Sequence, residues 1–310
     1  MISIISNRKS RPFVIRKKIL GAAIVSITFL AAAMVITIAL VMLGHFLIKG
    51  IPNISWEFLS QAPRNNNTEG GIFPAIYGTT FLVLTMALLG VPVGTATAVY
   101  LTEYAKQNSL FARSVRFGVN TLAGVPSIVF GLFGVGFFVH FIGSGIDGVL
   151  GNTSSVWGQP ALIWAAATLA VLTLPVVIVS VEEALRAVPR ELREASLALG
   201  ATKWQTVWRI VLPNSMTGIL TGSILAVGRG AGEVAPIIFV GAVYSLPELP
   251  SKITDQFMHL GYHLFVLATQ SPDVEAAMPK QYATTIVLLM LTFILNFTAT
   301  FIRSRIRNKK

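Results

Sequence analysis

Long runs of apolar residues, separated by short polar segments, dominate this chain. Each run can supply the roughly 20 apolar residues that a helix needs to cross a bilayer. The runs cover residues 19–48, 72–102, 117–146, 148–181 (helical from about residue 160), 214–243 and 282–302. This pattern predicts an all-α integral membrane protein with about six transmembrane helices.

The first run follows a basic stretch, so a secretory signal peptide has to be considered. The apolar part of a signal peptide is typically about 7–15 residues long, and the run at residues 19–48 is about twice that length. We therefore expect an uncleaved first transmembrane helix.

The composition supports a membrane location. Hydrophobic residues make up 54% of the chain and charged residues only 12%, whereas soluble domains carry about 25% charged residues. The sequence contains no cysteine, which excludes disulfides, thiolate metal ligands and cysteine nucleophiles. The formal net charge is +11, but the basic residues stand at the ends of the apolar runs. Basic residues in these positions orient the helices in the lipid membrane, and their distribution argues against a nucleic-acid partner.

The basic residues also predict which side each segment faces. Nineteen Lys and Arg fall in alternate segments, including both ends of the chain, against four in the other segments. Cytoplasmic segments of membrane proteins are enriched in Lys and Arg. We expect basic cytoplasmic tails at residues 1–18 and 304–310, a membrane domain at 19–303, and a location in the bacterial cytoplasmic (inner) membrane.

The segment 182–213 is too polar to cross a membrane, but its pattern predicts structure. Pro189 can begin a helix, and Gly200 can end it in the left-handed conformation. Thr202 can cap a second short helix, with Pro213 preceding the next crossing. The sequence predicts a helix, a glycine turn and a second short helix at the cytoplasmic face.

This segment resembles the EAA motif of ATP-binding cassette importer permeases, in which the loop docks into the ATPase subunit. The departure from the usual pattern is a serine in place of the second alanine. By this resemblance, Glu194, Ala195, Ser196 and Gly200 would couple the chain to the ATPase. From composition alone, a pair of helices lying on the lipid surface is the alternative. The matching residues are Glu194, Ala195, Ser196, Gly200, Ile210, Leu212 and Pro213.

Other stretches are similar to the A-type subunit of phosphate-specific permeases, although Val234 stands where that family usually has threonine. The resemblance implies a second, C-type permease subunit, two ATPase subunits that bind ATP and Mg, and an extracytoplasmic phosphate-binding protein. It implies no cofactor in this chain. The stretches are 71–79, 100–104, 123–134 and 232–236.

A charged pair interrupts the fifth run. Arg229 lies sixteen residues after Pro213, which is about 24 Å along a helix and so near or past the middle of the bilayer. Glu233, four residues later, would share a helix face with it. A charge at that depth is costly and usually faces a cavity or a partner. Arg229 is also matched by an arginine thought to matter for transport in phosphate permeases. We expect Arg229 and Glu233, with Ser127 as a weaker candidate, to line a substrate pathway; the alternative is a self-neutralising pair that holds helices together.

The chain has no phosphate-binding Gly-x-x-x-x-Gly-Lys-Ser/Thr loop and no Gly-x-Ser-x-Gly elbow, so we expect neither ATP hydrolysis nor other catalysis by this chain. His259 and His263 alone make a poor metal site, and an interfacial helix is the better interpretation. Two alternatives to phosphate import remain at this stage: a permease for another oxyanion or small solute, and a secondary transporter or channel that needs no ATPase.

Overall fold

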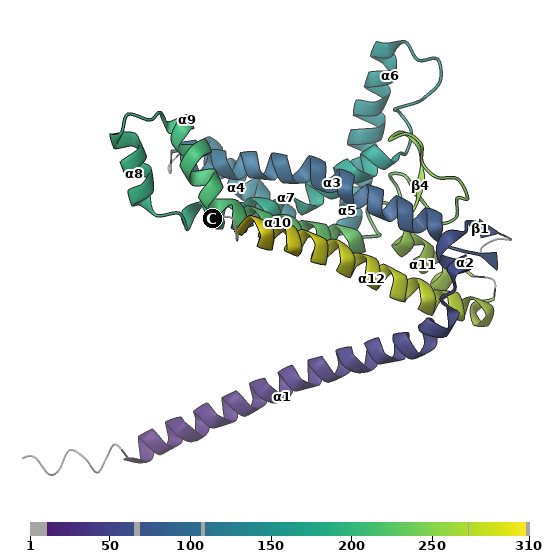
Figure 1. Ribbon diagram of the computed structural model, residues 1–310, viewed down its shortest axis with the longest axis horizontal. Helices are drawn as coiled ribbons and strands as arrows, with labels where there is room; N and C mark the ends of the chain where they lie inside the picture. Colours follow the sequence, from purple (N-terminus) through teal and green to yellow (C-terminus); the bar gives the residue numbers. More distant parts are fainter. Residues whose placement is uncertain (1–10, 65–68, 107–108, 272, 308–310) are drawn as a thin grey trace, which may run out of the picture.

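The computed structural model describes residues 11–64, 69–106, 109–271 and 273–307, and it is built almost entirely of helices (Figure 1). Six described helical segments are long and apolar enough to cross a membrane, which confirms the predicted number. These segments are Arg16–Asn53, Phe73–Tyr104, Ser127–Leu150, Leu162–Arg186, Lys203–Gly232 and Val274–Arg305.

The first crossing, α1 (Arg11–Gly50), stands apart from the rest of the chain. It meets α12 (Val274–Arg307) near Gly50, where a Cβ atom would collide with the backbone of Tyr282 and the side chain of Ile286. From there α1 leaves the bundle at an angle (Figure 1). None of its most apolar window is buried in this chain, so lipid or another subunit must cover it.

A short connection leads from α1 to the second crossing. It contains a helical turn (Ile51–Asn53), α2 (Trp56–Ser60), and the antiparallel strands β1 (Pro63–Arg64) and β2 (Glu69–Gly70). The second crossing is α3 (Phe73–Val99), which ends in a wide π-helical turn, Tyr100–Tyr104.

The centre of the bundle is α7 (Leu162–Arg186), which packs along α3 and along α10 (Leu212–Gly232). It is the most buried of the six crossings, as expected for a helix that is apolar all round. Small residues let these helices approach closely. A Cβ atom on Gly218 of α10, for example, would lie 2.2 Å from the Cβ of Ala184 in α7.

The third apolar run is not one helix, which corrects the prediction for residues 117–146. Its first part belongs to α4 (Leu110–Ala123), and the chain then breaks at residues 124–126. Helix resumes as α5 (Ser127–Phe133), a π-helical stretch (Gly134–Gly143) and α6 (Ser144–Leu150), and α6 projects away from the bundle (Figure 1). The break has a local cause, because Pro126 disfavours helix in the residue before it and follows a glycine closely.

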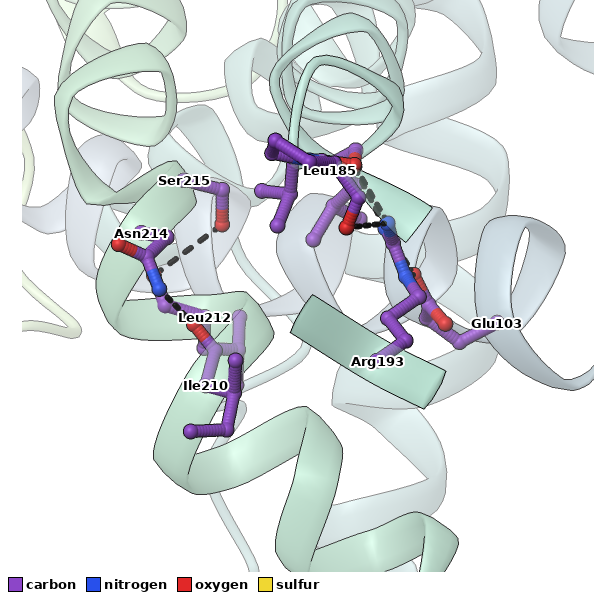
Figure 2. Close-up of polar contacts among 9 residues, drawn as sticks. Glu103, Leu185, Arg193, Ile210, Leu212, Asn214 and Ser215 are labelled. Atoms are coloured by element: carbon purple, nitrogen blue, oxygen red, sulfur yellow. Dashed lines mark hydrogen bonds and ion pairs between the residues drawn. The ribbon is translucent and has the colours of Figure 1, made fainter. Parts of the chain in front are cut away.

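The fifth crossing also differs from its prediction at both ends. The short helix α9 (Lys203–Thr206) does not stop before Pro213 but continues through a π-helical turn (Val207–Val211) into α10. Side chains bridge the backbone around the proline: Asn214 Nδ2 donates to the Ile210 carbonyl at 2.7 Å, and Ser215 Oγ to the Leu212 carbonyl at 3.1 Å (Figure 2). At the other end α10 stops at Gly232, well short of residue 243.

The chain after α10 forms turns and a two-residue parallel pairing of β3 (Ala242–Val243) with β4 (Phe257–Met258). The short apolar helix α11 (Leu260–Thr269) follows and packs against α12 and α3. The C-terminal end of α12 packs against α10, where Arg303 Nη1 donates to Thr221 Oγ1, and it lies at the opposite end of the bundle from α2 and α11 (Figure 1).

Candidate functional site

The segment after α7 folds as the predicted helix, glycine turn and second helix. Its first helix is α8 (Arg190–Ala198), with Pro189 at the N-cap. Gly200 has a φ of 84°, in the left-handed region. The Gly200 N–H donates to the Leu197 carbonyl and the Ala201 N–H to the Ser196 carbonyl, which is the bonding of a Schellman helix end. Thr202 caps α9 reciprocally with Gln205, at 3.2 Å and 2.8 Å.

The predicted coupling residues lie mainly on the surface of this segment. Glu194, Ala195 and Gly200 are exposed, while Ser196 is half-buried with its hydroxyl 2.9 Å from the hydroxyl of Thr206. No residue of α8 is buried. Around them is a group of exposed large apolar side chains, which we name the exposed loop surface, and such a surface marks an interaction site. It consists of Leu192, Leu197, Leu199, Trp204 and Trp208.

Arg193 fixes α8 against the bundle, a role that the sequence reasoning missed. Its Nη2 lies 2.8 Å from Oε1 of Glu103, at the end of the second crossing, and 2.7 Å from the Leu185 carbonyl of α7. Its Nη1 donates to the Val188 carbonyl at 2.6 Å. Figure 2 shows the guanidinium between these partners. The nearest sequence signal is the position of Arg193 directly before Glu194; its partner, ninety residues earlier, has no local signal.

Arg229 and Glu233 form an ion pair, but they do not share a helix face as predicted. Helix α10 ends at Gly232, and Glu233 is its C-cap in an extended conformation. Arg229 Nε still lies 3.6 Å from Glu233 Oε1. Gly230 and Gly232 weaken the helix here, and Pro236 disfavours helix just beyond, which explains the early end.

The Arg229 side chain remains 45% exposed although the helix around it is packed on two sides. Gly228 faces Asn296 of α12, and Gly230 faces Met86 of α3, both so closely that a Cβ atom would have little or no room. These glycines therefore hold α10 against its neighbours. The guanidinium, which cannot lose its proton, projects from this packed helix without being buried in the chain.

Ser127 is the first residue of α5 and is half-buried. The structure brings α5 against the segment after Glu233, because a Cβ atom on Gly131 would lie 2.8 Å from the Pro236 carbonyl oxygen. Within the described residues, Ser127 makes no hydrogen bond to Arg229 or Glu233. The structure thus places α5 against the segment that follows Glu233, and it does not join Ser127 to the charged pair.

The two histidines, His259 and His263, are buried and hydrogen-bonded within the fold. His259 caps α11 by accepting from the Tyr262 N–H, and His263 Nδ1 lies 2.8 Å from the Tyr244 carbonyl. Both side chains are buried, and burial lowers the pKa of His259 to about 3 and that of His263 to about 4. Both side chains pack inside the fold of this chain, and the interfacial position of α11 stays a prediction.

Known proteins are similar in sequence to this chain over most of its length. Residues 90–308 match the family described as binding-protein-dependent transport system inner membrane component. The chain is 30% identical over 294 residues to the probable ABC transporter permease protein YqgI of Bacillus subtilis, covering 90% of this chain and 94% of that protein. It is 40% identical over 192 residues to the phosphate transport system permease protein PstA 1 of Mycobacterium tuberculosis H37Rv, covering 62% of this chain and 57% of that one.

A solved structure shares the fold. A bacterial ABC transporter that imports the acidic polysaccharide alginate aligns with a TM-score of 0.65 at 16% identity, over 96% of this chain and 99% of the other. At that identity the likeness concerns the fold alone. Together with the six crossings and the segment built around Gly200, the family match shows that the chain belongs to the inner-membrane permease components of binding-protein-dependent transport systems.

Proposed function

We propose that this chain forms part of the pathway by which an ATP-driven importer carries inorganic phosphate into the cell. Relatives named as phosphate transport permeases support this substrate, among them PstA of Haemophilus influenzae at 37% identity over 62% of each chain. The residues around Arg229, which resemble the phosphate-specific permeases, support it as well.

The observation that carries the proposal is the half-exposed guanidinium of Arg229 at the end of an apolar crossing. A charge facing hydrocarbon is unfavourable by at least about 2.5–3.5 kcal/mol, so Arg229 has to face water, substrate or another subunit. A guanidinium offers two parallel donors to a phosphate. Glu233, at 3.6 Å, can hold Arg229 while the pathway is empty and release it when phosphate arrives.

The same structure offers surfaces for the partners that the family implies. We propose that the exposed loop surface, with Glu194, Ala195, Ser196 and Gly200, binds one of two cytoplasmic ATPase subunits. The uncovered α1 suits a second permease subunit, since it is apolar and finds no cover in this chain. An external phosphate-binding protein would deliver the substrate from the other end of the bundle, and both chain ends would be cytoplasmic.

The test is ATP-dependent uptake of radiolabelled phosphate into membrane vesicles that contain the chain and its partner subunits. Arg229→Lys keeps the charge but removes the fork, and losing one charge-assisted hydrogen bond of about 1.5–3 kcal/mol should lower uptake at least about tenfold. Arg113→Lys, an exposed arginine on α4, is the matched control and should leave uptake unchanged. Wild-type uptake in Arg229→Lys would refute the pathway assignment.

The same vesicles distinguish phosphate from other solutes. Unlabelled phosphate should compete with the labelled substrate, whereas sulfate in equal excess should not. Uptake that persists without ATP would contradict an ATP-driven importer and favour a secondary transporter or channel. Uptake of another oxyanion with the same dependence on Arg229 would keep the mechanism and change the substrate.

A further inference from the structure

A cavity of about 820 Å³ lies between the turn after α3 and the helices α4, α7 and α8. Arg193 and Glu194 in its wall have the roles given above, but no role has been assigned to the cavity itself. Its volume is within the usual range of small-molecule sites. Two of its residues are acidic, Glu103 and Glu194. Five are cationic: Lys106, Arg116, Arg186, Arg190 and Arg193.

The acidic residues around the cavity do not neutralise all of its cationic residues. Glu103 neutralises Arg193 at 2.8 Å. Glu182, at the wall of a smaller adjoining cavity, serves both Arg116 at 3.6 Å and Arg186 at 2.9 Å, so one carboxylate faces two guanidinium groups. Among the residues that the structure describes, Lys106 and Arg190 have no ion pair within 4 Å.

The free cationic groups come from two different parts of the fold. Lys106 follows the π-helical turn at the end of the second crossing, and Arg190 is the first residue of α8. Pro189, the N-cap of α8, offers no side-chain acceptor to the first turn of that helix. The positive end of α8 adds to the field of Arg190, and Glu191 and Glu194 near that end offset part of it.

Arg116 adds an incompletely satisfied group. Its Nη2 donates to the Leu101 carbonyl at 3.1 Å, but its Nε is buried without a hydrogen bond. Cationic residues at the end of a crossing can serve topology alone. Here, however, five of them line the same cavity, and guanidinium groups bind phosphate oxygens in pairs.

We propose that this cavity binds a phosphate group, carried either by the headgroup of an anionic lipid or by free inorganic phosphate. The location at one end of the crossings suits a lipid headgroup. Because the walls come from the turn after α3 and from α4, α7 and α8, a bound phosphate bridges α8 to the ends of the neighbouring helices. This site is separate from Arg229 and does not depend on the identity of the transported solute.

The test uses the purified full chain and the double variant Lys106→Gln/Arg190→Gln. Both side chains are exposed and lack ion pairs among the described residues, so the variant should fold, which circular dichroism checks. Arg209→Gln changes an exposed arginine that does not line the cavity, and it is the control for the loss of one positive charge outside the site. Arg186→Gln provides a second, single variant within the cavity wall.

One arm measures phosphatidylglycerol retained by the chain from phosphatidylcholine nanodiscs, using native mass spectrometry. The other titrates inorganic phosphate at constant ionic strength in detergent and follows the thermal unfolding midpoint. Each cation near a phosphate contributes about fivefold in affinity, so the double variant should bind about thirtyfold more weakly in the arm that detects the ligand. A lipid signal identifies a headgroup site, and a phosphate signal identifies a site for the free anion.

Three results would overturn the proposal. The wild-type chain could bind in neither arm, or Arg209→Gln could weaken binding as much as the double variant. The third is an unchanged affinity in the double variant and in Arg186→Gln, with only ATPase capture lost, which would make the cationic residues a protein contact. Arg229 does not line this cavity, so Arg229→Lys should leave phosphate binding in the phosphate arm unchanged. That result separates this cavity from the proposed pathway.

Discussion

Arg193 holds α8 to the bundle through several hydrogen bonds from one guanidinium. One guanidinium pairs with Glu103 and also donates to the carbonyls of Leu185 and Val188, at the end of α7 and just beyond it. The two charged side chains are only 19% and 9% exposed. Arg193 therefore links α8 directly to the end of α7 and to the turn after α3.

We expect Arg193→Ala to destabilise the chain by about 2–4 kcal/mol, because it leaves the carboxylate of Glu103 buried without a partner. Glu103→Gln should be milder, and the double variant should be more stable than additivity predicts, with a coupling of about 1–3 kcal/mol. Unfolding in mixed micelles measures these differences. Arg186→Ala removes a more exposed pair and should change stability by less than about 1 kcal/mol. Equal effects at Arg186 and Arg193 would contradict the anchor.

At the scale of elements, the arrangement of α8 and α9 depends on a helix end at Gly200 that only some residues can form. Gly200 takes a φ of 84°, and a Cβ atom there would meet nothing within 4 Å. Any penalty for replacing it is therefore conformational rather than steric. The turn sets the angle between α8 and α9, and thereby the arrangement of the exposed loop surface.

Substitutions at Gly200 should impair ATPase capture in a fixed order. Proline, locked near a φ of −65°, should be worst; alanine should cost about 1–2 kcal/mol; asparagine, which tolerates the left-handed region, should be mildest. Co-purification of the ATPase with the tagged chain measures the effect. Gly118→Ala, in open space within α4 and without a positive φ, should bind normally. A turn that accepted proline without loss of transport would rule out a docking role.

The contact between α7 and α10 is a second feature of this scale. Gly218→Ala places a methyl group 2.2 Å from the Cβ of Ala184, so we expect a loss of about 1–3 kcal/mol from overpacking. Adding Ala184→Gly makes room and should recover most of that loss, apart from the weaker helix propensity of glycine. Thermal unfolding of the two single variants and the double variant tests this. Additive losses would show that the helices do not meet there.

The whole molecule has two distinct ends. The helices α8 and α9 and the C-terminal end of α12 lie at one end, while α2, β1 and α11 occupy the other end (Figure 1). The excess of Lys and Arg in the segments at the first end predicts that it is cytoplasmic. The helix α1 diverges from the bundle at the end where α2 lies (Figure 1), and its uncovered apolar surface fits a subunit of a larger transporter.

Single cysteines can test this orientation, because the natural sequence has none. A cysteine replacing Leu199, which is 89% exposed, should react with a membrane-impermeant maleimide only after the cells are permeabilised. A cysteine at Ser154, in the exposed connection between α6 and α7, should react in intact cells. The unsubstituted chain is the blank. The reverse labelling pattern would invert the proposed topology.

The sequence alone determined the features that depend on local composition and on the bilayer. Six apolar runs imply six crossings, because a backbone in hydrocarbon must satisfy its hydrogen bonds within helices. The turn at Gly200 and the cap at Thr202 were also predictable, since both depend on the conformational preferences of single residues. The roles of Arg229, Glu233 and Ser127 in transport remain predictions that the uptake experiment addresses.

Only the tertiary structure decided where helices break or join and which distant residues meet. The fifth crossing continues through Pro213, where the side chains of Asn214 and Ser215 donate to backbone carbonyls, and it ends at Gly232. The hydropathy pattern predicts neither feature. Arg193 meets Glu103 across ninety residues of sequence, and the cationic cavity is lined by residues of α4, α7, α8 and the turn after α3. Such arrangements depend on how helices pack, because close approach and shared charge are properties of pairs of segments rather than of either segment alone.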